Sequence, residues 1–254
     1  MNDWPALASH LFDDPWQLLI ALLVIVVAYT LFSLMGFGTA LVASTPLAWI
    51  MPVARIVPLL AVLDGASAAQ RGWTLRRKVE RHCLRSLLPG MLAGQILGVT
   101  LLAHLPRALM AVLLGGFVMV LGVRGFRRQA GAGGASVPAW RAGLFGGVLG
   151  GLFGSGGFIY AAWLQPRLPD RDAFRATQAV MISVSTLWRI GLCLAAGLID
   201  GPLMLTALAL LPATWLGMAA GRWLDPRIDA RSYGHLLNGL LILSGLALMA
   251  RGLG

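Results

Sequence analysis

The sequence predicts an all-α polytopic membrane protein built from two inverted-topology repeats, each a broken or re-entrant helical hairpin plus three transmembrane helices. Of the 254 residues, 58% are hydrophobic and 12% are charged, and the mean hydropathy is +0.78. A soluble domain has about 25% charged residues. Apolar runs close to the roughly 20 residues that a helix needs to cross a bilayer follow one another along the chain. The two halves of the chain also resemble each other.

The apolar segments justify this prediction in chain order. We expect membrane-embedded helices at about 16–35, 37–51, 56–73, 86–103, 107–124, 142–165, 174–198, 202–221 and 235–252. The intervening stretch 125–141, "GFRRQAGAGGASVPAWR", is rich in Gly, Ala and Arg and is typical of a flexible linker. The predicted organisation is a first membrane repeat over 1–124, a cytoplasmic linker over 125–141 and a second membrane repeat over 142–254.

An internal alignment indicates the duplication. "LLPGMLAGQILG" at 87–98 aligns with "LLPATWLGMAAG" at 210–221: Pro89 coincides with Pro212, Gly94 with Gly217 and Gly98 with Gly221. Nearer the start of each half, Gly36 and Gly38 align with Gly154 and Gly156. Several matches at nearly constant offsets favour a repeat over chance similarity.

Loop charge predicts the orientation of the helices. The loop 71–85 and the linker are strongly positive and should be cytoplasmic, whereas "LIDGP" at 198–202 carries no Lys or Arg and should be external. Both chain termini are then predicted to be periplasmic. Segment 142–165 must enter the membrane and return to the same side, and its 24 residues are too few for two full spans. We therefore expect a re-entrant hairpin broken at "GSGG", as in transporters with inverted repeats.

The glycine-rich breaks are candidate anion sites. A helix interrupted inside the membrane exposes backbone N–H groups at the start of its second part, where the helix dipole favours an anion. Such irregular backbone is tolerated only against protein or a wet cavity. The candidate ligand-binding residues at the two breaks are Gly36, Gly38, Thr39, Ser44, Gly154, Ser155, Gly156 and Gly157.

The alternative is that the glycines only allow close helix packing. Pairs of small residues four apart let helix backbones approach each other. We assign this role to the repeated glycines of 90–98 and 217–221, and to those upstream of the break at 146–151.

Polar side chains inside apolar segments give further candidates, because ionisable groups in a membrane are costly. Gln178, Ser185 and Arg189 share one face of a helix, and Asp64 lies in the middle of another segment. In one interpretation Arg189 attracts an anion, Gln178 and Ser185 are neutral donors, and Asp64 couples transport to protons. In the other, Asp64 and Arg189 form a mutual ion pair or bond to free backbone carbonyls and so lock the bundle, or Arg189 extends to the outer surface.

The break motifs resemble those of the sulfite exporter TauE/SafE family. The second copy is "GSGGF…P" with Gly154, Gly156, Gly157 and Pro166, and the first is "GFGTA…P" with Gly36, Gly38 and Pro46. Thr39, Ala40 and Phe158 stand where the family pattern has glycine. The resemblance implies a secondary transporter of a small sulfur-containing oxyanion, such as sulfite or a sulfonate, in the bacterial inner membrane.

Other function classes fit the sequence less well. We find no nucleophile paired with a base, no carboxylate pair and no metal-ligand pattern, so we expect neither an enzyme nor a cofactor. The net charge of +10 is explained by loop arginines, not by a nucleic-acid surface. Two alternatives stay open: transport of another small anion such as a carboxylate, and a transporter-like scaffold subunit. The expected partners are the anion, the lipid bilayer and, as an open option, further copies of the chain.

Overall fold

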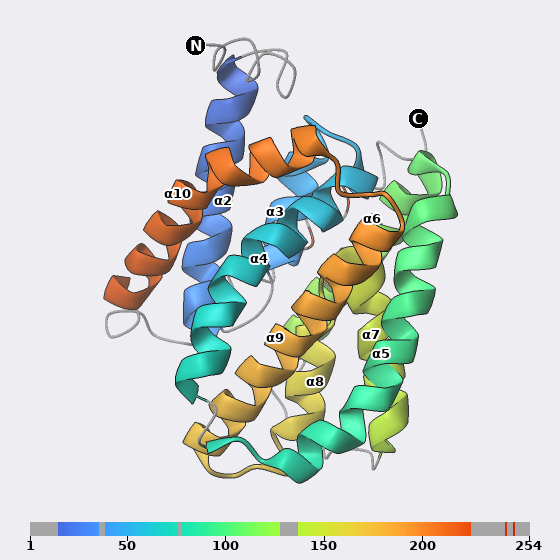
Figure 1. Ribbon diagram of the computed structural model, residues 1–254, viewed down its shortest axis with the longest axis vertical. Helices are drawn as coiled ribbons and strands as arrows, with labels where there is room; N and C mark the ends of the chain where they lie inside the picture. The colour runs from blue at the N-terminus through green and yellow to red at the C-terminus, as the bar shows by residue number, and fades with distance from the viewer. Residues whose placement is uncertain are drawn as a thin grey trace.

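The computed structural model describes residues 15–35, 39–75, 78–127 and 137–224, together with 242 and 246 (Figure 1). Throughout these ranges the regular elements are α-helices, which confirms the predicted all-α class. The helices are α2 Pro15–Met35, α3 Thr39–Leu47, α4 Val53–Leu75, α5 Arg81–His104, α6 Arg107–Arg127, α7 Ala139–Phe153, α8 Gly157–Leu164, α9 Arg171–Ala195 and α10 Gly201–Leu224. The predicted segment 235–252 lies outside the part of the chain that can be described as helix.

Four of these helices, α2, α5, α9 and α10, are long and apolar enough to cross a bilayer. Large apolar side chains project from their outer surfaces, as Leu23, Leu97 and Trp215 do, with more than half of each side chain exposed. In water such surfaces would be an aggregation hazard, whereas in lipid they are the expected outer face. The chain is therefore a polytopic membrane protein.

Helices α7 and α8 form a hairpin. The chain reverses at residues 154–156, where Gly154 ends α7 in the left-handed conformation, with φ 68° and ψ 12°. The two arms run antiparallel: Gly146 lies against the ring of Tyr160, and the Trp163 indole N–H donates to the carbonyl of Val137 at 2.9 Å. An arm of 15 residues is about 22 Å long, shorter than the roughly 30 Å hydrocarbon core. The chain thus folds back at the predicted break.

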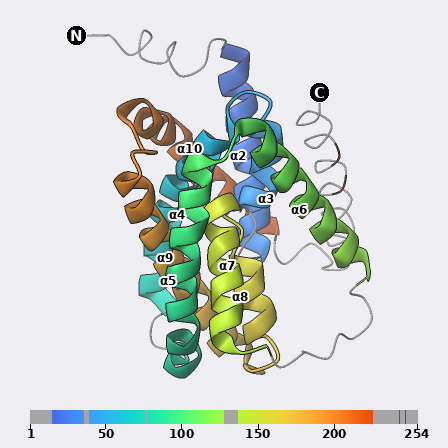
Figure 2. The same cartoon turned by 90° about the vertical axis from the view of Figure 1, so that its right-hand side faces the viewer.

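The hairpin is held against α5 by a seam of glycines. Figure 2 shows α5, α7 and α8 side by side. A Cβ on Gly94 would lie 2.2 Å from the carbonyl oxygen of Leu144, and one on Gly147 would lie 2.4 Å from that of Met91. The backbones are thus closer than any side chain permits. The seam consists of Gly90, Gly94 and Gly98 on α5 and of Gly143, Gly147 and Gly151 on α7.

A second close contact joins α2 to α10. A Cβ on Gly217 would lie 2.5 Å from the carbonyl oxygen of Val26, and one on Gly221 would lie 2.6 Å from that of Thr30. The packing interpretation of Gly217 and Gly221 is confirmed, as it is for the predicted seam glycines Gly90, Gly94, Gly98, Gly147 and Gly151. Both contacts bring backbone to backbone, which is how helices associate where lipid removes the hydrophobic driving force.

Between these two contacts, α4 and α9 run side by side in opposite directions through the centre of the molecule (Figure 1). The start of α4 lies near the end of α9, and the end of α4 lies near the start of α9. Asp64 and Arg189 lie at the middle level of this antiparallel pair, facing α2, α3 and the α7–α8 hairpin. The polar centre of the molecule is therefore assembled from five elements.

Candidate functional site

A buried ion pair forms the centre of the candidate site. Arg189 Nη2 on α9 lies 3.3 Å from Asp64 Oδ2 on α4, and the two residues are 3% and 6% exposed. Neither charge is left alone at membrane depth, where an unpaired charge is costly. Arg189 points into the bundle, so the idea that it extends to the outer surface is wrong.

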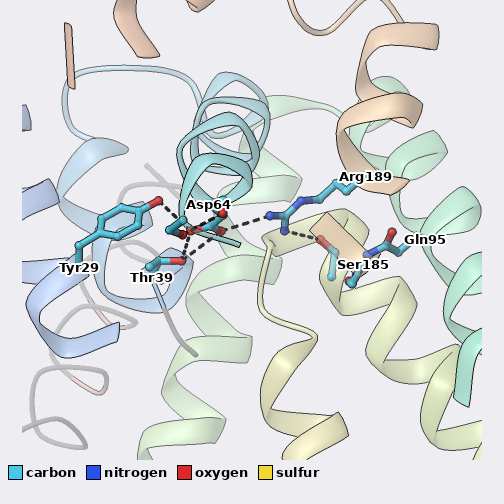
Figure 3. Close-up of polar contacts among 8 residues, drawn as sticks. Tyr29, Thr39, Asp64, Gln95, Ser185 and Arg189 are labelled. Carbon is cyan, nitrogen blue, oxygen red and sulfur yellow. Dashed lines mark hydrogen bonds and ion pairs between the residues drawn. The ribbon is translucent and has the colours of Figure 1, made fainter. Parts of the chain in front are cut away.

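The carboxylate of Asp64 accepts hydrogen bonds from two further helices (Figure 3). The hydroxyl of Tyr29 on α2 donates to Oδ1 at 2.7 Å, and that of Thr39 on α3 lies 3.1 Å from Oδ1 and 3.3 Å from Oδ2. Figure 3 shows these hydroxyls on one side of the carboxylate and Arg189 on the other. Asp64 is thereby held by donors from three helices, α2, α3 and α9.

Arg189 also binds the glycine hairpin. Its Nη1 donates to the carbonyl oxygen of Gly150 on α7 at 3.1 Å. Among the described residues its Nε–H has no hydrogen-bond acceptor. The guanidinium therefore links the α4 carboxylate to the hairpin and still has one donor to offer.

A small cavity of about 30 Å³ lies against this guanidinium. Asp64, Thr39, Ser185 and Arg189 line it together with the hairpin glycines Gly150, Gly154, Gly156 and Gly157. One water needs about 10–15 Å³ by this kind of measure, so the space holds roughly two waters. The cavity is thus a polar, water-sized space bounded by a cation and by exposed backbone.

Gly154 must be glycine at this wall of the cavity. Its φ of 68° is a conformation that L-residues rarely adopt. A Cβ there would also lie 2.8 Å from Arg189 Nη1 and 3.0 Å from the Cβ of Ala40. Gly156 lines the same cavity. A Cβ added there would lie 2.2 Å from the carbonyl oxygen of Gly146, so glycine at this position also lets the two arms of the hairpin approach each other.

The turn of the hairpin supplies further donors. Ser155 is 3% exposed, and among the described residues its hydroxyl has no hydrogen-bond partner. Directly after it, α8 begins at Gly157. The first N–H groups of a helix have no acceptor within that helix. Within the described part of the chain, one unpaired buried hydroxyl therefore lies at the predicted break, although Ser155 is not among the residues that line the cavity.

Gln95 of α5 contacts the cavity residue Ser185 without lining the cavity itself. Its side-chain Nε2 donates to the hydroxyl of Ser185 at 2.5 Å, and Gln95 is fully buried. Ser185 thus reaches the cavity wall with its orientation set by a neighbouring helix.

Other predicted residues do not reach the cavity. Ser44 is buried, but its hydroxyl donates to the carbonyl oxygen of Ala40 in its own helix. Gln178 shares a helix face with Ser185 but lies two turns away, about 10 Å along the axis. Among the described residues its side-chain nitrogen has no partner. Gly36 and Gly38 lie outside the described residues.

Sequence reasoning missed Tyr29. Its signal was its position: tyrosines of membrane proteins concentrate at the interfaces, whereas Tyr29 lies within a long apolar helix and is fully buried. A bond from Arg189 to a backbone carbonyl was one of the expectations, but the sequence did not indicate that the acceptor is Gly150, because every residue has a carbonyl group.

The fold and site define a class: a helical membrane protein with a buried charged centre, which is typical of membrane transporters. The family model described as "Sulfite exporter TauE/SafE" matches residues 21–248, and the chain belongs to this family of transporters. It is 31% identical over 195 residues to the probable inner membrane transporter protein TsaS of Comamonas testosteroni, an alignment covering 75% of this chain and 81% of that protein. No solved structure matches the chain significantly.

Proposed function

We propose that the protein moves a small sulfur-containing oxyanion, such as sulfite or a sulfonate, across the bacterial inner membrane by alternating access. The observation that carries this proposal is the position of Arg189, whose guanidinium borders both a carboxylate and a cavity walled by the glycine hairpin. Family membership supports the substrate class.

The donors around the cavity suit an oxyanion. A guanidinium presents a planar fork that matches two oxygens of an anion. The first N–H groups of α8, which begins at Gly157 on the cavity wall, can bind a further oxygen, and the dipole of α8 favours negative charge at that end. The Ser155 hydroxyl, which has no partner among the described residues, lies in the same turn, beside these wall residues. No second basic side chain is needed, because an anion that exchanges with Asp64 leaves the charge of the site unchanged.

In the proposed cycle, Asp64 pairs with Arg189 while the site is empty, and the substrate takes its place beside the guanidinium when it binds. It satisfies Arg189 in the empty site, so an arriving anion must compete with it for the guanidinium. Once released, the carboxylate takes up a proton, and the hydroxyls of Tyr29 and Thr39 remain beside it as partners that can also accept a hydrogen bond. This exchange would couple anion movement to protons. The cavity holds only about two waters, so binding requires the bundle to open.

We place the two inverted repeats at 1–124 and 142–254, with the cytoplasmic linker 125–141 between them and both termini periplasmic. The order of the helices supports the duplication. Thr39 begins α3 and Gly157 begins α8, an offset of 118 residues that also separates Val53 at the start of α4 from Arg171 at the start of α9. Equivalent helices that pack antiparallel, as α4 and α9 do, are what an inverted repeat requires.

The decisive experiment compares variants that differ only at the guanidinium. Removal of either partner leaves a buried charge unpaired, at a cost of about 3–5 kcal/mol. A bound anion can restore the balance beside Arg189 in Asp64→Asn, but not beside Asp64 in Arg189→Gln. Binding is therefore measured in Asp64→Asn and in the double variant Asp64→Asn/Arg189→Gln, with Arg222→Gln as an exposed arginine control. Thermal stabilisation by sulfite, sulfate, thiosulfate, sulfonates and carboxylates is recorded for each.

We expect Asp64→Asn to bind sulfite or a sulfonate at least as tightly as the parent, because the competing carboxylate is gone. The double variant should lose about tenfold or more, since a hydrogen bond to a charged group contributes about 1.5–3 kcal/mol. Equal affinity in these two variants would contradict the site. Preferential binding of carboxylates would reassign the substrate, and no binding of any anion to the parent would favour a scaffold subunit.

A further inference from the structure

Three ion pairs lie at three levels where α4 meets α9 and its flanking connections. We call Arg55–Asp200 the outer pair, Asp64–Arg189 the central pair and Lys78–Asp172 the inner pair, with N–O distances of 3.0, 3.3 and 2.5 Å. The names follow the predicted sides of the loops 198–202 and 71–85. Each pair joins the first half of the chain to the second. The outer and inner pairs lie near opposite ends of α4, whose 23 residues span about 34 Å.

The outer pair closes one end of this interface. Arg55 lies in the first turn of α4 and Asp200 directly precedes α10. The second carboxylate oxygen of Asp200 accepts the N–H of Leu203 at 2.8 Å, so Asp200 also caps α10. Arg55 borders a cavity of about 330 Å³ between the α3–α4 connection and the start of α10, with walls that include Met51, Leu59 and Thr206.

The inner pair closes the opposite end. Lys78 lies in the connection between α4 and α5, and Asp172 lies in the first turn of α9. A second tie between the same segments is the Glu80 N–H, which donates to the hydroxyl of Thr177 at 2.9 Å. The hydrogen bond to Asp172 raises the pKa of Lys78, so this lysine stays charged in the closed arrangement.

The terminal pairs differ from the central one in their access to water. The side chains of the outer pair are 54% and 42% exposed and those of the inner pair 64% and 62%, whereas those of the central pair are 4% and 9% exposed. An exposed ion pair favours its closed state by roughly two- to fivefold and is easily broken and reformed. A contact that must open in every transport cycle needs this property.

We propose that the outer and inner pairs are the two gates of the transporter and that they open in alternation. This inference rests on the proposed alternating access. With both pairs formed, the central cavity has room for about two waters. Separation of Arg55 from Asp200 opens the end that borders the larger cavity, and separation of Lys78 from Asp172 opens the other. Two weak gates of similar strength keep the open states close in population, so loss of one pair shifts the balance toward that side.

Thiol labelling tests this inference with one reporter toward each end of α9. Cys193 is fully buried, one turn beyond Arg189 toward the outer end, and Gln178→Cys places a thiol at a buried position toward the inner end. The outer reporter carries Cys83→Ser, and the inner reporter carries Cys83→Ser and Cys193→Ser. Maleimide labelling rates are measured in nanodiscs, where reagent reaches both faces.

The gate variants remove charge and keep shape. Asp200→Asn breaks the outer pair while retaining an oxygen that caps α10. It should raise the Cys193 rate about two- to fivefold and lower the rate at the inner reporter. Asp172→Asn should do the reverse. The double variant Lys78→Gln/Asp172→Asn should match Asp172→Asn, because one interaction is lost in both. The control Arg85→Gln removes an exposed charge at the inner end and should change neither rate.

Reciprocal changes at the two reporters support the gates. Rates that rise together in each variant, or that do not change, overturn them, because a merely structural ion pair would loosen both ends or neither. Sulfite stabilisation is measured on the same proteins. Normal anion binding without reciprocal labelling refutes the gates alone, whereas absence of anion binding in the parent refutes the proposed function, whatever the labelling rates.

Discussion

Two glycines with the same backbone conformation allow the effect of the Arg189 contact at residue 154 to be separated from the cost of the backbone conformation. Gly154 has φ 68° and Gly197 has φ 67°. An alanine at either position has to adopt the left-handed conformation, at a cost of about 1–2 kcal/mol. The surroundings differ: a Cβ at 197 meets no atom within 4 Å, whereas one at 154 meets Arg189 Nη1 at 2.8 Å and the Cβ of Ala40 at 3.0 Å. Gly197→Ala is therefore a matched control for Gly154→Ala.

The expected difference follows from the Arg189 contacts. The methyl group of Gly154→Ala has to push Nη1 away by several tenths of an ångström, and Nη1 holds the Gly150 carbonyl at 3.1 Å. Loss of a hydrogen bond to a charged group costs about 1.5–3 kcal/mol. Gly154→Ala should thus destabilise the protein by about 2.5–5 kcal/mol and Gly197→Ala by about 1–2 kcal/mol.

Denaturation in detergent gives the two stabilities, and titration with sulfite gives the affinities. Gly154→Ala should bind sulfite about tenfold or more weakly, because the guanidinium is displaced from the cavity, while Gly197→Ala should bind like the parent. If both variants lose the same stability and keep the parent affinity, the contact between residue 154 and Arg189 does not shape the site.

Two further predictions use the same kind of matched pair. Ser155→Ala should weaken sulfite binding several-fold, because it removes a buried donor at the turn, whereas Ser44→Ala should leave the affinity unchanged, because its hydroxyl bonds within its own helix; equal effects in titrations would contradict the assignment. Gly94→Ala should destabilise the fold by about 1–3 kcal/mol through overpacking of the seam. Gly191→Ala, at a helical position with no atom within 4 Å, should be neutral or stabilising by up to about 1 kcal/mol. Denaturation midpoints of both variants test this, and a lower stability of Gly191→Ala than of Gly94→Ala would contradict it.

The break and the packing glycines were predictable because their signals are local. Glycine is unfavourable inside a helix, so a run such as "GSGG" within an apolar segment marks the reversal that the structure has at Gly154. Glycines four residues apart likewise indicated close helix packing, but the partners, α7 for α5 and α2 for α10, come from the structure. These features depend on neighbours in sequence and need no knowledge of the tertiary fold.

Partners distant in sequence were not predictable in the same way. Helical periodicity gave the face that Gln178 shares with Arg189 but not the depth at which the cavity lies. The pairing of Arg55 with Asp200, 145 residues away, depends on how α4 meets the start of α10. The sequence left open whether Asp64 and Arg189 pair or act in transport. The structure has the pair beside a cavity, so the two interpretations are compatible.

The glycine contacts also bear on how the chain could be divided. The α5–α7 seam joins a helix of the predicted first repeat to one of the second, and so does the α2–α10 contact. One helix of each repeat therefore packs against the other repeat, and the linker 125–141 does not separate two independently packed units. If either repeat were made alone, its glycine-lined helix surfaces would lack the backbone that they are shaped to meet. The two halves are expected to be interdependent in assembly, so that a protein split at the linker would regain its structure only when both pieces are present together.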